Sequence, residues 1–80
     1  MKVYGRSKEN PNVLLTLEEV SFLAGPEELR SLANFFLVQA SSQESGSGRD
    51  HEHYLDSEGA IQGEVEVVVA DPALLQLARD

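Results

Sequence analysis

Two histidines that are two residues apart come closest, in type and spacing, to a metal site. His51 and His53 flank Glu52, and Asp56 follows a little further along the chain. On a β-strand, residues two apart point to the same face, so both imidazoles could reach one ion. Glu52 and Asp56 have the opposite parity and cannot supply a third ligand on that face. A two-histidine metal protein is therefore a minor alternative, and we expect no metal and no cofactor.

The competing interpretation of these two histidines is structural. Burying a neutral imidazole costs less free energy than burying a carboxylate. We therefore expect His51 and His53 to lie at the periphery of a sheet, beneath or beside a helix, with Glu52 and Asp56 on the other face.

Catalysis finds little support in the rest of the sequence. The chain contains no cysteine, and its serines gather around residues 41–50, in a Gly/Ser-rich stretch that indicates flexibility rather than a nucleophile. A chain of 80 residues has room for a single domain (residues 1–80) with a small core, but not for a separate substrate domain. We expect a protein that is not an enzyme.

The excess of carboxylates is the strongest functional signal. The chain has 14 acidic and 6 basic residues and a formal net charge of -8 at pH 7. This balance argues against nucleic acid as a partner, because binding there depends on Lys and Arg at the phosphates. It favours a basic protein partner. No stretch is apolar enough for a membrane span or a signal peptide, so we expect a cytoplasmic protein with no membrane partner.

Several acidic side chains are predicted to share one face of a sheet. If Ile61 and the valines at 65, 67 and 69 point to the core, the acidic residues between them point the other way, together with alternate residues of the neighbouring strand. The predicted partner-binding surface consists of Glu52, Tyr54, Asp56, Glu64 and Glu66. Tyr54 would be an aromatic anchor among the charges. An ordinary solvated acidic face is the alternative.

A helix over residues 26–40, or slightly beyond, must form the centre of the fold. Pro26 suits a first helical position, and Glu27 and Glu28 suit the positive end of the helix dipole. The apolar residues form one broad stripe that we expect to face the sheet: Leu29, Leu32, Ala33, Phe36, Leu37 and Ala40. Val38 and, less clearly, Phe35 lie off this stripe.

Four segments have strand-like patterns, over residues 1–4, 12–24, 51–55 and 61–70. Turn-forming residues join the first two and the last two, which predicts two hairpins. In the second segment the apolar parity slips at Glu18-Glu19, and a β-bulge there would return both apolar sets to one face. The alternative is a strand that changes which face it buries. Asp71 and Pro72 supply a cap and a first-turn proline for a short terminal helix over residues 73–78.

These elements predict an α+β fold with the order β-β-α-β-β. Hairpins make the sheet mainly antiparallel, so we expect two layers, with a four-stranded sheet covered on one face by the single helix. The strand order 1-2-4-3 would place the longest strands at the centre. Residues 41–50 would form a flexible loop, and residues 71–80 a short C-terminal helical turn or tail.

A helix-start motif and an H-x-H motif together carry a resemblance to a known family. The motifs are Pro26-Glu27-Glu28-Leu29-Arg30, continuing through Leu32-Ala33 and Phe35-Phe36-Leu37, then the His51-x-His53-x-Leu55-Asp56 spacing and a valine-rich segment near the C-terminus. The chain resembles the immunity protein 32 family of bacterial polymorphic toxin systems, from its first strand to about Pro72. The Gly/Ser-rich stretch at 41–50 and the residues after Pro72 depart from that pattern.

The resemblance implies an immunity protein that binds and neutralises a cognate bacterial toxin domain and has no catalytic residues of its own. A basic toxin would match the acidic composition of the chain. The alternatives are a small regulatory or adaptor module that binds an unrelated partner, and the two-histidine metal protein.

Overall fold

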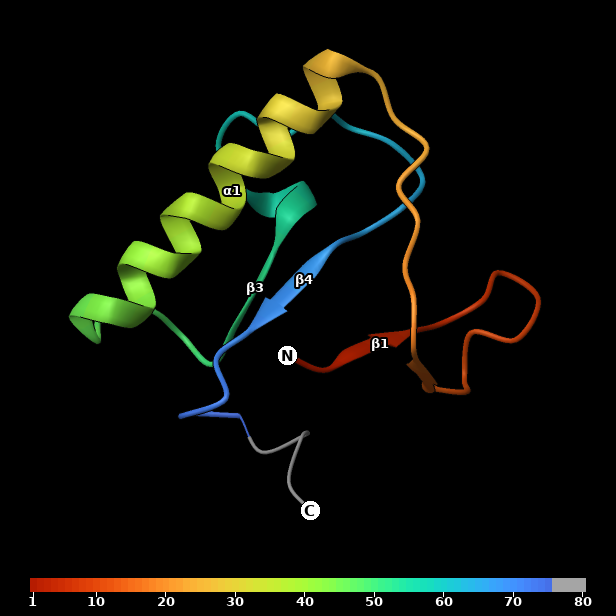
Figure 1. The fold of residues 1–80 in the computed structure, drawn as a ribbon, viewed down its shortest axis with the longest axis horizontal. Helices are drawn as coiled ribbons and strands as arrows, with labels where there is room; N and C mark the ends of the chain where they lie inside the picture. Colours follow the sequence, from red (N-terminus) through yellow and green to blue (C-terminus); the bar gives the residue numbers. More distant parts are fainter. Residues whose placement is uncertain (76–80) are drawn as a thin grey trace.

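The chain folds as one long helix accompanied by short strands. The computed structural model describes residues 1–75, and within them the elements follow in the order β1 (Val3–Gly5), β2 (Leu15–Leu17), α1 (Pro26–Ser45), β3 (His51–His53), the 3-10 helix η1 (Tyr54–Asp56) and β4 (Val68–Ala70) (Figure 1). The predicted α+β class is confirmed.

The strands pair as two separate antiparallel hairpins. Val3 lies opposite Leu17 in the β1–β2 pair, and Glu52 lies opposite Val69 in the β3–β4 pair. The two predicted hairpins are confirmed, whereas the single four-stranded sheet is wrong: among residues 1–75 no ladder joins β2 to β4. Figure 1 shows why, since the chain leaves β2 as an extended segment that runs to the start of α1.

The parity slip at Glu18-Glu19 marks the end of a strand rather than a bulge. β2 stops at Leu17, and residues 18–25 form no strand. Similarly, β4 occupies only the last part of the predicted segment 61–70. Both long predicted strands are therefore mostly connecting segments, and this explains why they cannot build a wide sheet.

The helix begins as predicted and ends later than predicted. Pro26 is the first helical residue, and Gly25 before it makes no side-chain cap. At the other end Gly46 adopts the left-handed conformation at φ 71°, its N–H donates to the Gln43 carbonyl, and the Ser47 N–H donates to the Ser42 carbonyl. This pair of bonds is a Schellman motif, which only a residue without a Cβ enters easily. Residues 41–45 are thus helical, and the expected flexible loop is reduced to residues 46–50.

The buried side of α1 is centred on Phe35, not on the predicted stripe. Phe35 is 4% exposed, whereas Phe36 is 40% exposed and Leu37 is 69% exposed. The half-buried residues of α1 are Ser31, Leu32, Gln39 and Ser42, which share a face with Phe35. The short hairpins cannot cover the broad apolar stripe. The helix instead packs against them with the face that carries Phe35 and Ser31, which contact Tyr54.

Asp71, directly after β4, makes hydrogen bonds through both its side chain and its backbone. Its carboxylate accepts a hydrogen bond from the Ala73 N–H at 2.9 Å, and its own N–H donates to the Asp50 carbonyl at 2.8 Å, next to the β3–β4 ladder. The carboxylate thus makes the hydrogen bond expected of a cap, whereas the terminal helix that it was predicted to begin stays a prediction. Residues 72–74 form a turn, and the remainder of the predicted terminal helix, from residue 76 on, lies outside the described residues.

No helix within residues 1–75 is both long enough and apolar enough to cross a bilayer.

Candidate functional site

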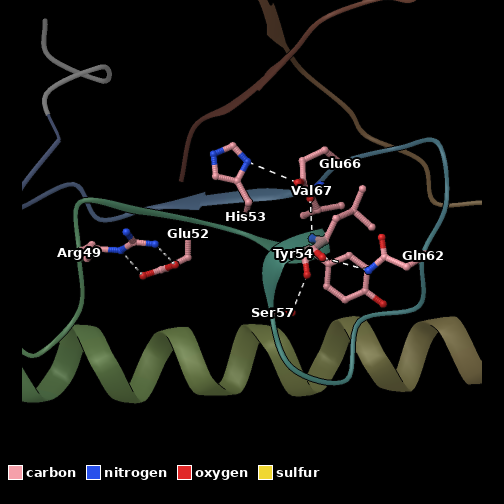
Figure 2. A network of polar contacts seen from close by, with 9 residues as sticks. Arg49, Glu52, His53, Tyr54, Ser57, Gln62, Glu66 and Val67 are labelled. Carbon is pink, nitrogen blue, oxygen red and sulfur yellow. Dashed lines mark hydrogen bonds and ion pairs between the residues drawn. The ribbon is translucent and has the colours of Figure 1, made fainter.

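The side chains of Glu52, His53 and Tyr54, where β3 meets η1, point alternately toward and away from α1. Figure 2 shows His53 directed away from the helix and Tyr54 lying against it. The prediction had the opposite parity, with the histidines beneath the helix and Tyr54 on the outer face. Tyr54 buries far more apolar surface than an imidazole, so its burial decides which way the strand faces.

Tyr54 is the centre of a hydrogen-bond network that joins α1 to the segment after η1. Tyr54 is only 5% exposed, and its ring packs edge-on against the ring of Phe35, with 5.5 Å between the ring centroids. The Tyr54 hydroxyl lies 2.6 Å from Ser31 Oγ and accepts the Ile61 N–H at 2.9 Å, while Ser31 Oγ donates to the Gly59 carbonyl at 3.0 Å. Since the Ser31 proton is used on Gly59, Tyr54 donates to Ser31. Tyr54 therefore joins α1 to the segment after η1 and is not an exposed anchor.

Glu66 is turned back onto the backbone. Its Oε1 accepts the Leu55 N–H at 2.8 Å and the Val67 N–H at 3.0 Å, and its Oε2 lies 3.4 Å from His53 Nδ1 (Figure 2). These donors lie where the β3–β4 ladder ends, and the carboxylate takes the place of the missing strand partner. Gln62 likewise satisfies a backbone group of Leu55: its Nε2 donates a hydrogen bond to the Leu55 carbonyl at 3.0 Å.

Glu52 is paired with Arg49 by two parallel hydrogen bonds. Arg49 Nε and one terminal nitrogen each lie 2.9 Å from a different carboxylate oxygen of Glu52. This hydrogen-bonded guanidinium holds the pKa of Glu52 below its ordinary value, and Glu52 in turn raises the pKa of Arg49. The pair fastens the loop after α1 to β3, so one of the predicted binding carboxylates already has a partner.

Of the predicted surface, Asp56, Glu64 and Glu66 are exposed, whereas Glu52 is half-buried and Tyr54 is buried. The Glu64 side chain is 87% exposed and makes a long ion pair with Lys8, with 3.8 Å between Nζ and the carboxylate. The structure does not bring all five of these residues to one exposed face, because Tyr54 is buried and Glu52 and Glu66 accept hydrogen bonds from within the chain. Whether any of these residues contacts a partner stays a prediction.

The two histidines do share a face, as their spacing predicts. Their ring centroids are 5.2 Å apart, and Nδ1 of His51 lies 2.8 Å from Asp50 Oδ1. His53 has Glu66 as its carboxylate neighbour. Within residues 1–75 no group of three His, Cys, Asp or Glu side chains is arranged to hold a metal ion.

Ser31, Phe35 and Gln62 support this region and were not identified from the sequence. Ser31 and Phe35 lie one turn apart on α1 and are therefore neighbours on one face, but neither residue type indicates by itself that this face meets Tyr54. Gln62 offered no signal, because its role depends on where the β3–β4 ladder happens to end.

Comparison with known proteins places this region inside a recognised family. The model of the family described as Immunity protein 32 matches residues 19–72, from the connection before α1 to the proline after β4. The matched segment contains α1, the β3–β4 hairpin and the whole Tyr54 network. No match to a curated protein or to a solved structure was found. Since the family model covers more than half of the 80 residues, the chain belongs to the immunity protein 32 family.

Proposed function

We propose that this protein binds a basic toxin domain and neutralises it without catalysis. The observation that carries the proposal is the family match over residues 19–72, since an immunity role implies a toxin to be resisted. The acidic composition supports the basic character of that toxin, because opposite net charges attract over distance and like charges repel.

The carboxylates available for such binding are mostly on the surface. The exposed acidic residues include Glu18, Glu19, Glu27, Glu28, Asp56, Glu58 and Glu64. Cations are few by comparison, with 6 Lys and Arg against 14 Asp and Glu, and one of these cations, Arg49, is held by Glu52. The protein therefore presents a net negative field that would steer a cationic partner and accelerate encounter.

Binding to the toxin would then be sufficient to neutralise it. A bound immunity protein covers part of the toxin surface and keeps its target away, which requires affinity and placement but no reactive group in the immunity protein. The protein would act in the compartment where the toxin is made, which we infer to be the cytoplasm.

Protection of cells tests the proposal. The toxin domain encoded beside the gene for this chain would be expressed from an inducible promoter, with or without the chain. Survival of cells only when both are present, and recovery of a one-to-one complex from them, is the expected result. Growth arrest in both cases, with the chain expressed and folded, would contradict the proposal and favour an adaptor that serves another partner.

A further inference from the structure

A groove of about 200 Å³ lies where the connection before α1 meets the segment that leads to β4. In Figure 1 these two connections, one orange and one blue, cross beside the first turns of α1. Residues 22–24 form one wall of the groove, and residues from the segment 61–67 form the other. Neither wall belongs to a strand in this region, so the groove is formed by the two predicted strands that the chain does not pair.

The walls of the groove are apolar and lack covering side chains. Phe22 is 49% exposed, Val65 is 67% exposed, and Leu23 is fully exposed. Adjacent apolar side chains exposed to this degree around one concavity are typical of a surface that a partner covers. A partner that docks here would remove these side chains from water.

The floor of the groove is held in place by the Tyr54 network. Tyr54 and Leu32 both line it, and Tyr54 is fixed by its hydrogen bonds to Ser31 and Ile61. The groove therefore needs little reorganisation to receive a side chain, which reduces the entropy lost on binding.

Two carboxylates border the same groove. Glu28, from the first turn of α1, and Glu64, from the opposite wall, both line it. No hydrogen bond or ion pair engages the Glu28 carboxylate within residues 1–75, and the long contact of Glu64 with exposed Lys8 is weak. The concavity thus combines an apolar interior with negative charge on two sides.

We infer that this groove receives a cationic side chain, arginine or lysine, from the toxin. The apolar stem of such a side chain would lie on Phe22, Leu32 and Val65, and its charged head would reach Glu28 or Glu64. This inference rests on the proposed function and names the contact through which it acts. A second copy of the chain fits poorly, because it would bring the same acidic rim and a net charge of -8 to the interface.

Charge-neutral and groove-filling variants test the inference. Glu28→Gln, Glu64→Gln and the double variant remove the rim charge, and Gly63→Trp fills the groove from a position where an added Cβ meets nothing within 4 Å. Glu44→Gln is the matched control: it removes the same charge from the same helix, at a residue 16 positions away, about 24 Å along the axis. Circular dichroism would show that each variant keeps its fold.

Binding to the toxin domain encoded beside the gene would be measured by surface plasmon resonance. The double variant should weaken binding at least about tenfold and Gly63→Trp at least as much, whereas Glu44→Gln should change it less than about twofold. A double-mutant cycle that pairs Glu64→Gln with Arg→Ala or Lys→Ala changes in the toxin should show coupling at one cationic residue.

The possible results distinguish a failure of the groove inference from a failure of the proposed function. If the wild-type chain binds the toxin and every groove variant binds within about twofold of it, the groove inference is overturned and the immunity role stands. If Gly63→Trp weakens binding but the rim variants do not, the occupant is not cationic, and the inference is likewise overturned. If the wild-type chain does not bind at all, the proposed function fails and the groove inference fails with it.

Discussion

The Tyr54 hydroxyl joins α1 to the segment after η1. Removing only that oxygen, in Tyr54→Phe, leaves the Ile61 N–H without its acceptor and Ser31 without its donor, so we expect the free energy of unfolding to fall by about 1–2 kcal/mol. Tyr54→Ala also removes the ring that packs on Phe35 and should cost about 3–5 kcal/mol. Urea denaturation followed by circular dichroism measures both. Equal, negligible effects would contradict the interior position of Tyr54.

The Arg49–Glu52 pair gives a pH dependence whose sign follows from the lowered pKa of Glu52. A carboxylate with a lower pKa in the folded than in the unfolded state stabilises the fold above its unfolded pKa, and this stabilisation is lost as the pH falls through the folded value. Arg49→Gln should move the pKa of Glu52 back toward its ordinary value, because the hydrogen-bonded guanidinium is the main cause of the shift.

An NMR titration of the Glu52 side-chain carboxyl in both proteins tests this. Arg30→Gln, which removes a cation elsewhere and leaves the Arg49–Glu52 hydrogen bonds in place, is the control and should leave the pKa of Glu52 lowered. A Glu52 pKa that does not rise in Arg49→Gln would show that the bidentate pair does not form in solution.

At this scale the sequence predicted that the two histidines share a face, but not which way the neighbouring side chains point or which residues surround Tyr54. His51 and His53 were correctly placed on one face, yet the faces of Tyr54 and His53 were exchanged. On a strand a shift of one residue reverses every side chain, and the charge pattern of Glu52 and Asp56 was a weaker guide than the apolar area of one tyrosine.

The orientation of α1 can be tested with two adjacent phenylalanines. Phe35→Ala should lower the free energy of unfolding by about 3–5 kcal/mol, because it empties the contact with Tyr54, whereas the half-exposed Phe36 should cost clearly less when truncated in the same way. Chemical denaturation of the two variants provides the comparison. If Phe36→Ala proves the more damaging change, the helix face predicted from its apolar stripe would be right after all.

The end of α1 rests on one glycine. Gly46 has a φ of 71°, and a Cβ added there would meet nothing within 4 Å, so Gly46→Ala should destabilise through the backbone alone, by about 1 kcal/mol. Gly63→Ala is the control, since Gly63 also has open space but no left-handed φ. Thermal unfolding should show a lower Tm for Gly46→Ala only. Equal Tm values for both variants would contradict the Schellman closure.

Elements were predicted best where local signals are strong. Pro26 and the acidic first turn fixed the start of α1, and the turn-forming residues between strands fixed the hairpin pairs. The helix end was missed because Gly46 stands among serines and glycines that also suit a loop, and only the Schellman hydrogen bonds distinguish the two. The four-stranded sheet was predicted wrongly because nothing local in a sequence shows whether strands distant along the chain pair, and here the two hairpins stay separate.

At the scale of the whole molecule, charge and uncovered apolar surface point to the same conclusion. Within residues 1–75 only Phe35 and Tyr54 are buried large apolar side chains, while Leu23, Leu37 and Val65 are largely exposed. A chain of this size is expected to be only marginally stable by itself. A basic partner that covers this apolar surface and complements the net charge of -8 would both bind the chain and stabilise its fold.

The most direct test of this account is the association rate of the chain with the toxin domain encoded beside its gene, measured by stopped-flow at low and high salt. We expect a one-to-one complex whose association rate falls steeply as salt rises, because an acidic surface would steer a basic partner. A folded chain that does not bind this toxin domain, or that binds it at a rate independent of salt, would contradict it.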